Sequence, residues 1–201
     1  MSMDKKSLNA ALFSVRRETE AVAAAEELVS SPAFEEAVEI LKTVPRIMTC
    51  ASGSSGIAAK KFAHSLCCIE RGAMFMPPCE AVHGGLGGLK PEDAMVMVSR
   101  GGKTAELLPI IDVCKVKGAK LIAVTENLDS PLAKAADVVL KMNPGAESDH
   151  DNTMATASYV QTIAIFDALL CALIEETGYT KEQLALIHPG GAVGARLNPA
   201  K

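Results

Sequence analysis

The pattern of apolar and polar positions along the chain predicts strands that alternate with helices. Short apolar runs of strand length occur five times, at residues 46–50, 73–76, 93–98, 120–125 and 137–141. The third run is almost unbroken Ala, Met and Val, which is typical of a parallel strand covered on both faces. Because helical patterns separate the runs, we expect an α/β fold, a three-layer αβα sandwich with a five-stranded parallel doubly wound sheet.

Helical periodicity is clearest outside the strand-rich region. Apolar residues recur at helical intervals over residues 5–29, and Ser30-Ser31-Pro32 predicts a break before a second helix over 33–43. A short helix is expected over 130–136. A long helix over 153–177 is apolar nearly all round, so we expect it to be buried against the sheet or between subunits. We therefore divide the chain into an N-terminal helix, residues 1–30, and an α/β domain, residues 31–201.

Composition excludes several classes of function. The 201 residues suffice for one full α/β domain, and 49% hydrophobic and 22% charged residues are typical of a soluble globular chain. A net charge of -4 and an aromatic content of 3% without Trp argue against a nucleic-acid partner. The first ten residues lack an apolar signal region, and polar residues interrupt the apolar stretch 160–174. We expect a cytoplasmic protein with no membrane partner.

The six cysteines carry no predicted chemistry. They form no C-x-x-C pair, and most lie among apolar residues, where free Cys behaves as a small core residue. We therefore predict no metal site among them.

The loops that follow the strands are the candidate site, because ligands of doubly wound sheets bind at the carboxyl ends of the strands. The third strand is followed by SRGGKT, which combines Ser99, two glycines and Thr104 with a helix expected to begin near Lys103. Backbone N–H groups, hydroxyls and a helix dipole at such a turn attract a phosphate. Ser54 and Ser55 offer similar groups after the first strand. The same residue types also serve as helix caps.

Neither loop fits a nucleotide-binding motif. The segment 51–56 has no G-x-G-x-x-G, and Met76-Pro77-Pro78 ends the second strand where a ribose-binding carboxylate is expected. No Gly precedes the G-K-T of residues 102–104 at the spacing of a phosphate-binding P-loop. A single phosphate monoester remains the ligand that both loops suit.

Read together, five segments resemble the SIS (sugar isomerase) domain family, and within it the arabinose-5-phosphate isomerase branch. The segments are GSSG at 53–56, EAVHGGLG at 80–87, SRGGKTAE at 99–106, TENLDSPLAKAADVVL at 125–140 and HPGGAVGARL at 188–197. The resemblance covers about residues 30–197. Longer members add two regulatory CBS repeats after the HPGG segment, so the resemblance implies a single-domain form with residues 31–201 as the isomerase domain.

The resemblance implies reversible isomerisation between D-arabinose 5-phosphate and D-ribulose 5-phosphate through a cis-enediol. Such chemistry needs a carboxylate base, help with ring opening and a grip on the phosphate, and it requires no metal or redox cofactor. By motif, Glu106 or Glu147 acts as acid/base, His188 assists ring opening or proton transfer, and His83 lies in the HGGLG segment. The matching substrate-binding residues are Ser54, Ser55, Ser99, Arg100, Gly102, Lys103 and Thr104.

The family also implies a homo-oligomer, commonly a tetramer, whose sites are completed across subunit boundaries. Convergence of Glu106, Glu147 and His188 on one pocket would favour an enzyme over a sugar-phosphate-binding module without catalysis. Because this chain departs from the arabinose-5-phosphate branch at several residues, both an enzyme and a non-catalytic binding module remain possible.

Three departures bear on the substrate. Ser54 stands where the branch has Lys, Gly101 replaces the second Ser of S-x-S-G, and Tyr159 ends the segment that matches T-S-S-T. Arg100 and Lys103 can supply compensating charge, although their donor geometries differ. An isomerase of another phosphosugar, such as a hexulose 6-phosphate, therefore remains an alternative, as does a non-catalytic regulatory SIS protein.

Overall fold

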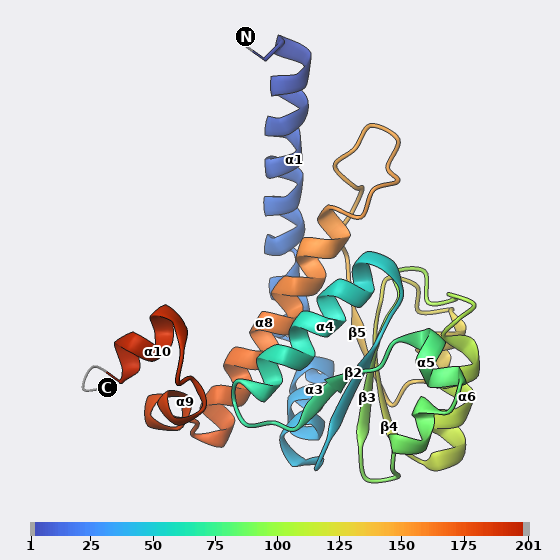
Figure 1. The fold of residues 1–201 in the computed structure, drawn as a ribbon. Helices are drawn as coiled ribbons and strands as arrows, with labels where there is room; N and C mark the ends of the chain where they lie inside the picture. Colours follow the sequence, from blue (N-terminus) through green and yellow to red (C-terminus); the bar gives the residue numbers. More distant parts are fainter. Residues whose placement is uncertain (1–2, 199–201) are drawn as a thin grey trace.

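The computed structural model describes residues 3–198, which form a parallel five-stranded sheet with helices on both faces (Figure 1). The strands are β1 (Ile47–Cys50), β2 (Ala73–Phe75), β3 (Ala94–Val98), β4 (Lys120–Thr125) and β5 (Val138–Lys141). Their order is β2-β1-β3-β4-β5, and each neighbouring pair is parallel. The predicted three-layer fold is confirmed, and each strand ends within about one residue of its predicted bounds.

Two layers of helices enclose the sheet. One layer contains α3 (Pro32–Thr43), α4 (Gly53–Cys67) and α8 (Ala157–Thr177), and the other contains α5 (Pro78–Val82), α6 (Leu108–Lys117) and α7 (Pro131–Ala135). The other helices are α1 (Lys5–Ala23), α2 (Ala25–Val29), the 3-10 helix η1 (Gly85–Gly88), α9 (Lys181–Ile187) and α10 (Gly191–Leu197). Figure 1 shows α1 and the α9–α10 pair extending away from the layered body.

The position of β3 between two layers of helices explains why its sequence is apolar throughout. Ala94, Val96 and Val98 belong to the core cluster under α3, α4 and α8. Met95 and Met97 belong to the cluster under α5, α6 and α7. Successive side chains of a strand point to opposite faces, so a strand covered on both sides has no position for a polar side chain.

The long helix α8 is the core helix of its layer. It packs against α1, α3 and α4, and Phe166 stacks on Phe62 with ring centroids 4.2 Å apart. Ile165, Phe166 and Leu169 of α8 share a core cluster with strand side chains, so the first predicted position, burial against the sheet, is confirmed. By length and composition α8 is apolar enough to cross a membrane, so the interrupted pattern alone does not exclude that role. Its contacts with the neighbouring helices are those of a helix inside a folded domain.

The N-terminal helix is attached to the domain near the carboxyl edge of the sheet. The helix predicted over residues 5–29 is interrupted at Ala24, between α1 and α2. Within α1, Arg17 donates hydrogen bonds to the carbonyl oxygens of Pro144 and Ala146, at 3.0 and 3.1 Å. The side-chain amide of Gln161 on α8 donates to the carbonyl oxygen of Ala21 at 2.7 Å. The inner half of α1 therefore supports the loop that follows β5.

Helix α6 begins later than the periodicity predicted. Its first residue is Leu108 rather than a residue near Lys103. Pro109 lies in its first turn, where the missing N–H costs no intrahelical hydrogen bond, so the chain favours a start at this point. The segment 99–107 is left as a loop.

Helix α8 also begins later, at Ala157 instead of 153. The carboxylate of Asp149 accepts hydrogen bonds from the N–H groups of Thr153 at 3.0 Å and Met154 at 2.7 Å. These bonds satisfy backbone donors in a turn that competes with helix formation. The loop 143–156 therefore remains outside the helix, beside the carboxyl end of β5.

The Phe62–Phe166 stack supplies a test of the α4–α8 contact. Both side chains are fully buried, so Phe166→Ala should lower the free energy of unfolding by about 3–5 kcal/mol through lost transfer energy and a cavity. Denaturant unfolding monitored by circular dichroism measures this change. Val116→Ala, at a position 87% exposed, is the control and should change stability by about 0.5 kcal/mol or less. Equal effects of the two substitutions would contradict the packing described.

Candidate active site

The strand order places a topological switch point between β1 and β3. From β1 the chain proceeds outward to β2, and the remaining strands are added on the other side, beginning with β3. In sheets with this order, ligands bind outside the carboxyl ends of the two strands at the switch. The crevice here is bounded by residues 51–55, which comprise the loop after β1 and the first turn of α4, and by the loop after β3, residues 99–107. Both loops carry residues predicted from the sequence to bind substrate.

Glycines allow α4 to begin directly at this crevice. Gly53 has a positive φ of 59°, a conformation that L side chains rarely adopt. A Cβ at Gly56 would lie 2.7 Å from the carbonyl oxygen of Ala51, so only Gly permits this close approach of helix and strand. Ser54 and Ser55 follow in the first turn, where free N–H groups and the positive end of the helix dipole favour an anion.

The larger lobe of the crevice is a pocket of about 410 Å³ that contains Glu106. The loop after β1, the first turns of α4 and the loop after β2 form its other walls, and Phe75 and Pro77 make part of the lining apolar. Lys60, two turns into α4, brings a positive charge to the same pocket. A carboxylate and an ammonium group in one partly apolar pocket can exchange a proton with a ligand and hold its anionic group.

The narrower lobe lies between the first turns of α4 and α8. Ser54, Ser55, Arg100, Ser158 and Tyr159 line it, and its free volume is about 10 Å³. This is about the smallest volume that holds one water molecule. The structure thus brings together three predicted substrate-binding residues from two segments, the first turn of α4 and the loop after β3.

The turn after β3 is organised by its own hydroxyl groups. The hydroxyls of Ser99 and Thr104 lie 2.8 Å apart, and the Ser99 Oγ also accepts a hydrogen bond from the Gly102 N–H at 3.1 Å. Gly102 has a φ of 66°, and a Cβ there would collide with the side chain of Ser130. Lys103 is exposed on the same turn. The turn therefore carries two adjoining hydroxyl groups and an exposed lysine, which are residue types that phosphate sites use.

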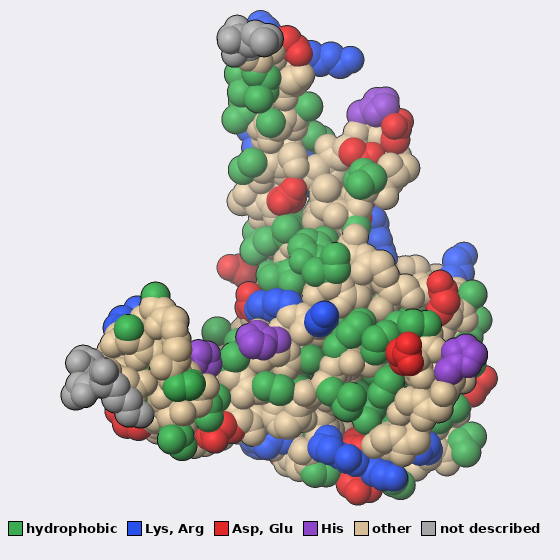
Figure 2. Space-filling view, viewed as in Figure 1, with side chains coloured by type: hydrophobic (Ala, Val, Ile, Leu, Met, Phe, Trp, Pro, Cys, Tyr) green, Lys and Arg blue, Asp and Glu red, His purple; other side chains and the backbone are tan. Residues whose placement is uncertain are grey.

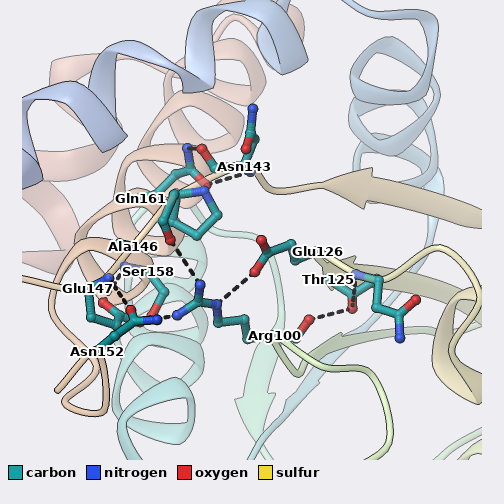
Figure 3. Close-up of polar contacts among 12 residues, drawn as sticks. Arg100, Thr125, Glu126, Asn143, Ala146, Glu147, Asn152, Ser158 and Gln161 are labelled. Carbon is teal, nitrogen blue, oxygen red and sulfur yellow. Dashed lines mark hydrogen bonds and ion pairs between the residues drawn. The ribbon is translucent and has the colours of Figure 1, made fainter.

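Glu147 is buried, with only 4% of the residue exposed, and its carboxylate accepts five hydrogen bonds. Figure 3 shows it beside Arg100 and Ser158. Its Oε1 accepts from Arg100 Nη1 at 2.6 Å and from the Ser158 hydroxyl. Its Oε2 accepts from the Thr156 N–H at 2.9 Å, the Thr156 hydroxyl at 3.1 Å and the Ser158 N–H at 3.1 Å. A carboxylate has about four lone-pair sites, so these donors occupy its capacity.

The hydrogen bonds keep Glu147 ionised. Burial raises the pKa of this carboxyl group, but the hydrogen bonds from Ser158 and Thr156 and the charge of Arg100 outweigh burial and hold its pKa below the ordinary value of 4.5. A group that must accept a proton from substrate needs a free lone pair and a pKa closer to neutrality. In this structure the carboxylate of Glu147 therefore has no lone pair free to accept a substrate proton.

Arg100 connects three loops at the carboxyl edge (Figure 3). Its Nε donates to Glu126 at 2.7 Å, its Nη1 to Glu147 at 2.6 Å and its Nη2 to the carbonyl oxygen of Gly145 at 2.9 Å. Glu126 directly follows β4, whereas Gly145 and Glu147 follow β5. Each nitrogen of the guanidinium group thus donates to the protein.

Neither of the two predicted catalytic histidines lines these lobes. His83 is exposed at the end of α5. His188 ends α9, and its buried Nδ1 has no hydrogen-bond partner among residues 3–198. The α9–α10 pair lies beyond the C-terminal end of α8, whereas the crevice lies near the other end of that helix (Figure 1). Glu106, Glu147 and His188 therefore do not share one pocket within a single chain.

Two residues at the crevice were not predicted from the sequence. Lys60 shares the pocket-facing side of α4 with Gly53, Gly56 and Ile57, a helical spacing that would have found it once the start of the helix was known. Glu126 immediately follows β4, so the rule that sites lie at the carboxyl ends of strands also indicates it. Its partner Arg100 lies 26 positions away in sequence, and that spacing gives no local signal.

Comparison with known proteins agrees with the fold. The SIS domain family model matches residues 40–172. The arabinose 5-phosphate isomerase KdsD of Pseudomonas aeruginosa is 39% identical over 165 residues, which cover 82% of this chain and 51% of that protein. The arabinose 5-phosphate isomerase KpsF of Escherichia coli is 37% identical over 145 residues, 72% of this chain and 46% of the relative. The chain thus spans about half the length of these curated relatives.

Solved structures of similar size share the whole fold. A candidate sugar-phosphate isomerase of Listeria monocytogenes has a TM-score of 0.89 and 43% identity, and the match covers 94% of this chain and 100% of that one. A protein of Escherichia coli CFT073, solved in complex with arabinose 5-phosphate, has a TM-score of 0.84 and 28% identity, with coverage of 93% and 100%. The match of the family model includes both loops of the crevice and Glu147, and it ends before His188. The chain belongs to the SIS domain family.

Proposed function

We propose that this protein is an aldose–ketose isomerase that interconverts D-arabinose 5-phosphate and D-ribulose 5-phosphate. The observation that carries the proposal is the position of Glu106 in the pocket of about 410 Å³ at the switch point. This residue lies two positions after Thr104, whose hydroxyl is 2.8 Å from that of Ser99, so the proposed base follows the proposed phosphate-binding turn directly in the chain. The names of the KdsD and KpsF relatives and the arabinose 5-phosphate complex of the similar structure support this substrate.

The reaction requires only the movement of protons. A base removes the proton from C2 of the open-chain aldose, which gives a cis-enediol, and a proton is then delivered to C1. The hydroxyl proton on O2 moves to O1, so C2 becomes the carbonyl of the ketose and no electrons leave the substrate. Glu106 is the group in the pocket that suits the transfer between C1 and C2, because one carboxylate can accept and return the same proton.

Glu106 suits this role better than Glu147. Its side chain is exposed to the pocket, whereas the carboxylate of Glu147 is occupied by donors from Arg100, Thr156 and Ser158. A base must reach the substrate proton directly or through one water. Of the two carboxylates that the sequence left as alternatives, we therefore assign the acid/base role to Glu106.

The phosphate would be held by the turn after β3. The hydroxyls of Ser99 and Thr104 and the backbone around Gly102 form the polar face of this turn, and Lys103 adds charge. The positive charge that related sequences carry at the position of Ser54 would come from Lys60, which lines the pocket with Glu106. A substrate bound in this way spans from the phosphate turn to the carboxylate.

A second copy of the chain would complete the site with His188. The α9–α10 pair that carries this residue extends from the body, and apolar Leu186 and Val193 are exposed on it. Leu8 and Leu12 are exposed on the projecting part of α1, where Figure 2 shows hydrophobic side chains gathered. Exposed apolar surface of this kind favours association. We propose a homo-oligomer, with a tetramer as the arrangement that the family resemblance implies.

The cytoplasm is the compartment that fits this function. All six cysteines are free, which fits a compartment where thiols are kept reduced. Only Cys50 and Cys114 are buried, so the expectation that the cysteines are core residues is wrong for the other four.

Removal of the proposed base should abolish most of the activity. Glu106→Gln should lower kcat on D-arabinose 5-phosphate by about 10²–10⁴-fold, because the amide cannot accept the C2 proton. The measurement is formation of ribulose 5-phosphate, beside a panel that includes a hexulose 6-phosphate. Glu92→Gln, at an exposed position before β3 on the opposite edge of the sheet, is the matched control and should keep normal turnover.

The panel also separates the alternatives. Wild-type turnover of only another phosphosugar would replace the substrate proposed here. Binding of phosphosugars with no turnover of any of them would indicate a regulatory binding protein.

Mixing two inactive variants tests whether the site is shared between copies. His188→Ala and Glu106→Gln should each be nearly inactive alone, but oligomers that contain both should recover part of the activity. Recovery is expected because some sites in the mixture combine an intact Glu106 with an intact His188 from another copy. The variants are co-expressed with different tags, purified through both tags and assayed. Mixed oligomers that stay inactive would show that His188 does not complete a neighbouring site.

A further inference from the structure

Arg100 is fixed to the carboxyl edge through its backbone as well as its side chain. Its carbonyl oxygen accepts hydrogen bonds from the Thr125 hydroxyl and the Glu126 N–H, each at 3.0 Å. Its guanidinium group donates to Glu126, Glu147 and the Gly145 carbonyl oxygen. A side chain with these contacts on opposite sides has little freedom to turn toward a ligand.

The charge of Arg100 is also compensated by the protein. Two carboxylates, those of Glu126 and Glu147, form ion pairs with the one guanidinium group, so the three side chains together carry one negative charge. Glu147 is almost completely buried in this cluster, whereas Glu126 is partly exposed. A phosphate that approached Arg100 would have to compete with a buried carboxylate that Thr156 and Ser158 also hold.

The Arg100–Glu147 pair joins the phosphate turn to the start of α8. Arg100 is adjacent to Ser99, whose hydroxyl organises the turn. Glu147 accepts hydrogen bonds from Thr156 and Ser158 at the first turn of α8. The pair therefore sets the spacing between two segments that line the narrow lobe of the crevice.

Arg17 holds the same loop from the other side. It donates to the carbonyl oxygens of Pro144 and Ala146, so the loop between β5 and α8 is bonded to α1 as well as to Arg100. With that support in place, loss of Arg100 should loosen the phosphate turn without unfolding the loop. The role of Arg100 can therefore be measured in a variant that remains folded.

We propose that Arg100 is a positioning residue for the phosphate of the substrate, acting through Glu147 to hold the Ser99–Thr104 turn against α8. This positioning role takes the place of the substrate-binding role that the sequence predicted for Arg100. The inference rests on the proposed function only in naming a phosphosugar as the ligand. Its test is therefore a binding measurement.

A double-mutant cycle tests the inference. The dissociation constants of D-arabinose 5-phosphate and of inorganic phosphate are measured by calorimetry for wild type, Arg100→Met, Glu147→Gln and the double variant. Each single substitution should weaken binding about tenfold, since a charged hydrogen bond is lost, and the double variant should also lose about tenfold rather than a hundredfold. Saturating kcat should change less than about threefold, because Glu106 lies in the other lobe.

Direct binding of the phosphate by Arg100 would give a different result. If Arg100 bound the phosphate directly, Glu147→Gln would release its guanidinium group and binding would stay the same or tighten, which would overturn the inference. Independent, multiplicative effects of the two substitutions would also overturn it. Arg100→Lys should bind about as weakly as Arg100→Met, because an ammonium group cannot reproduce the three directed contacts of the guanidinium group.

Two further variants keep the experiment decisive. Glu126→Gln is the matched control and should weaken binding less than about threefold, because the Arg100–Glu126 pair is partly exposed. Thermal melting checks that each variant is folded, and Ser158→Ala, which removes one donor to Glu147, takes its place in the cycle if Glu147→Gln does not fold. A wild type that binds phosphosugar without isomerising it would refute the proposed function and leave this cycle fully informative.

Discussion

Burial of the parallel sheet on both faces is the constraint on which the rest of the structure depends. β3 has apolar side chains under both helical layers, so neither face of the sheet can carry a polar site. Polar chemistry is confined to the loops at the ends of the strands. The order β2-β1-β3-β4-β5 then selects one position on the carboxyl edge, because the loops after β1 and β3 diverge there and leave a crevice.

Charges at this edge have two different settings. Glu106 and Lys60 lie in an open pocket, where water and ligands reach them. Glu147 and Arg100 lie deeper and bond to each other and to the surrounding loops. A buried ion pair is stable only when its remaining donors and acceptors are also satisfied, and the contacts of Thr156, Ser158 and Gly145 meet that requirement. One pair is thus suited to chemistry and the other to holding shape.

The helices at the two ends of the chain link the site to assembly. α1 supports the loop after β5 through Arg17 and then continues past the body with exposed apolar side chains. The α9–α10 pair carries His188 away from the crevice of its own chain. Association of copies through these projecting helices would bury apolar surface and bring a histidine to a neighbouring crevice, so the proposed catalysis and the proposed assembly depend on the same elements.

The sequence by itself determined the fold class, the five strands and the two loops that form the crevice, because these follow from local patterns of apolar residues, glycines and hydroxyls. It also indicated Glu106, since that residue belongs to the same short motif as Ser99 and Thr104. Only the tertiary structure decided that Glu147 is saturated with hydrogen bonds and that Arg100 bonds to protein groups, because their partners lie as much as 47 positions apart. The tertiary structure also decided where two helices begin, because Pro109 favours the late start of α6 and the Asp149 turn the late start of α8. The length of α8 separates His188 from the crevice.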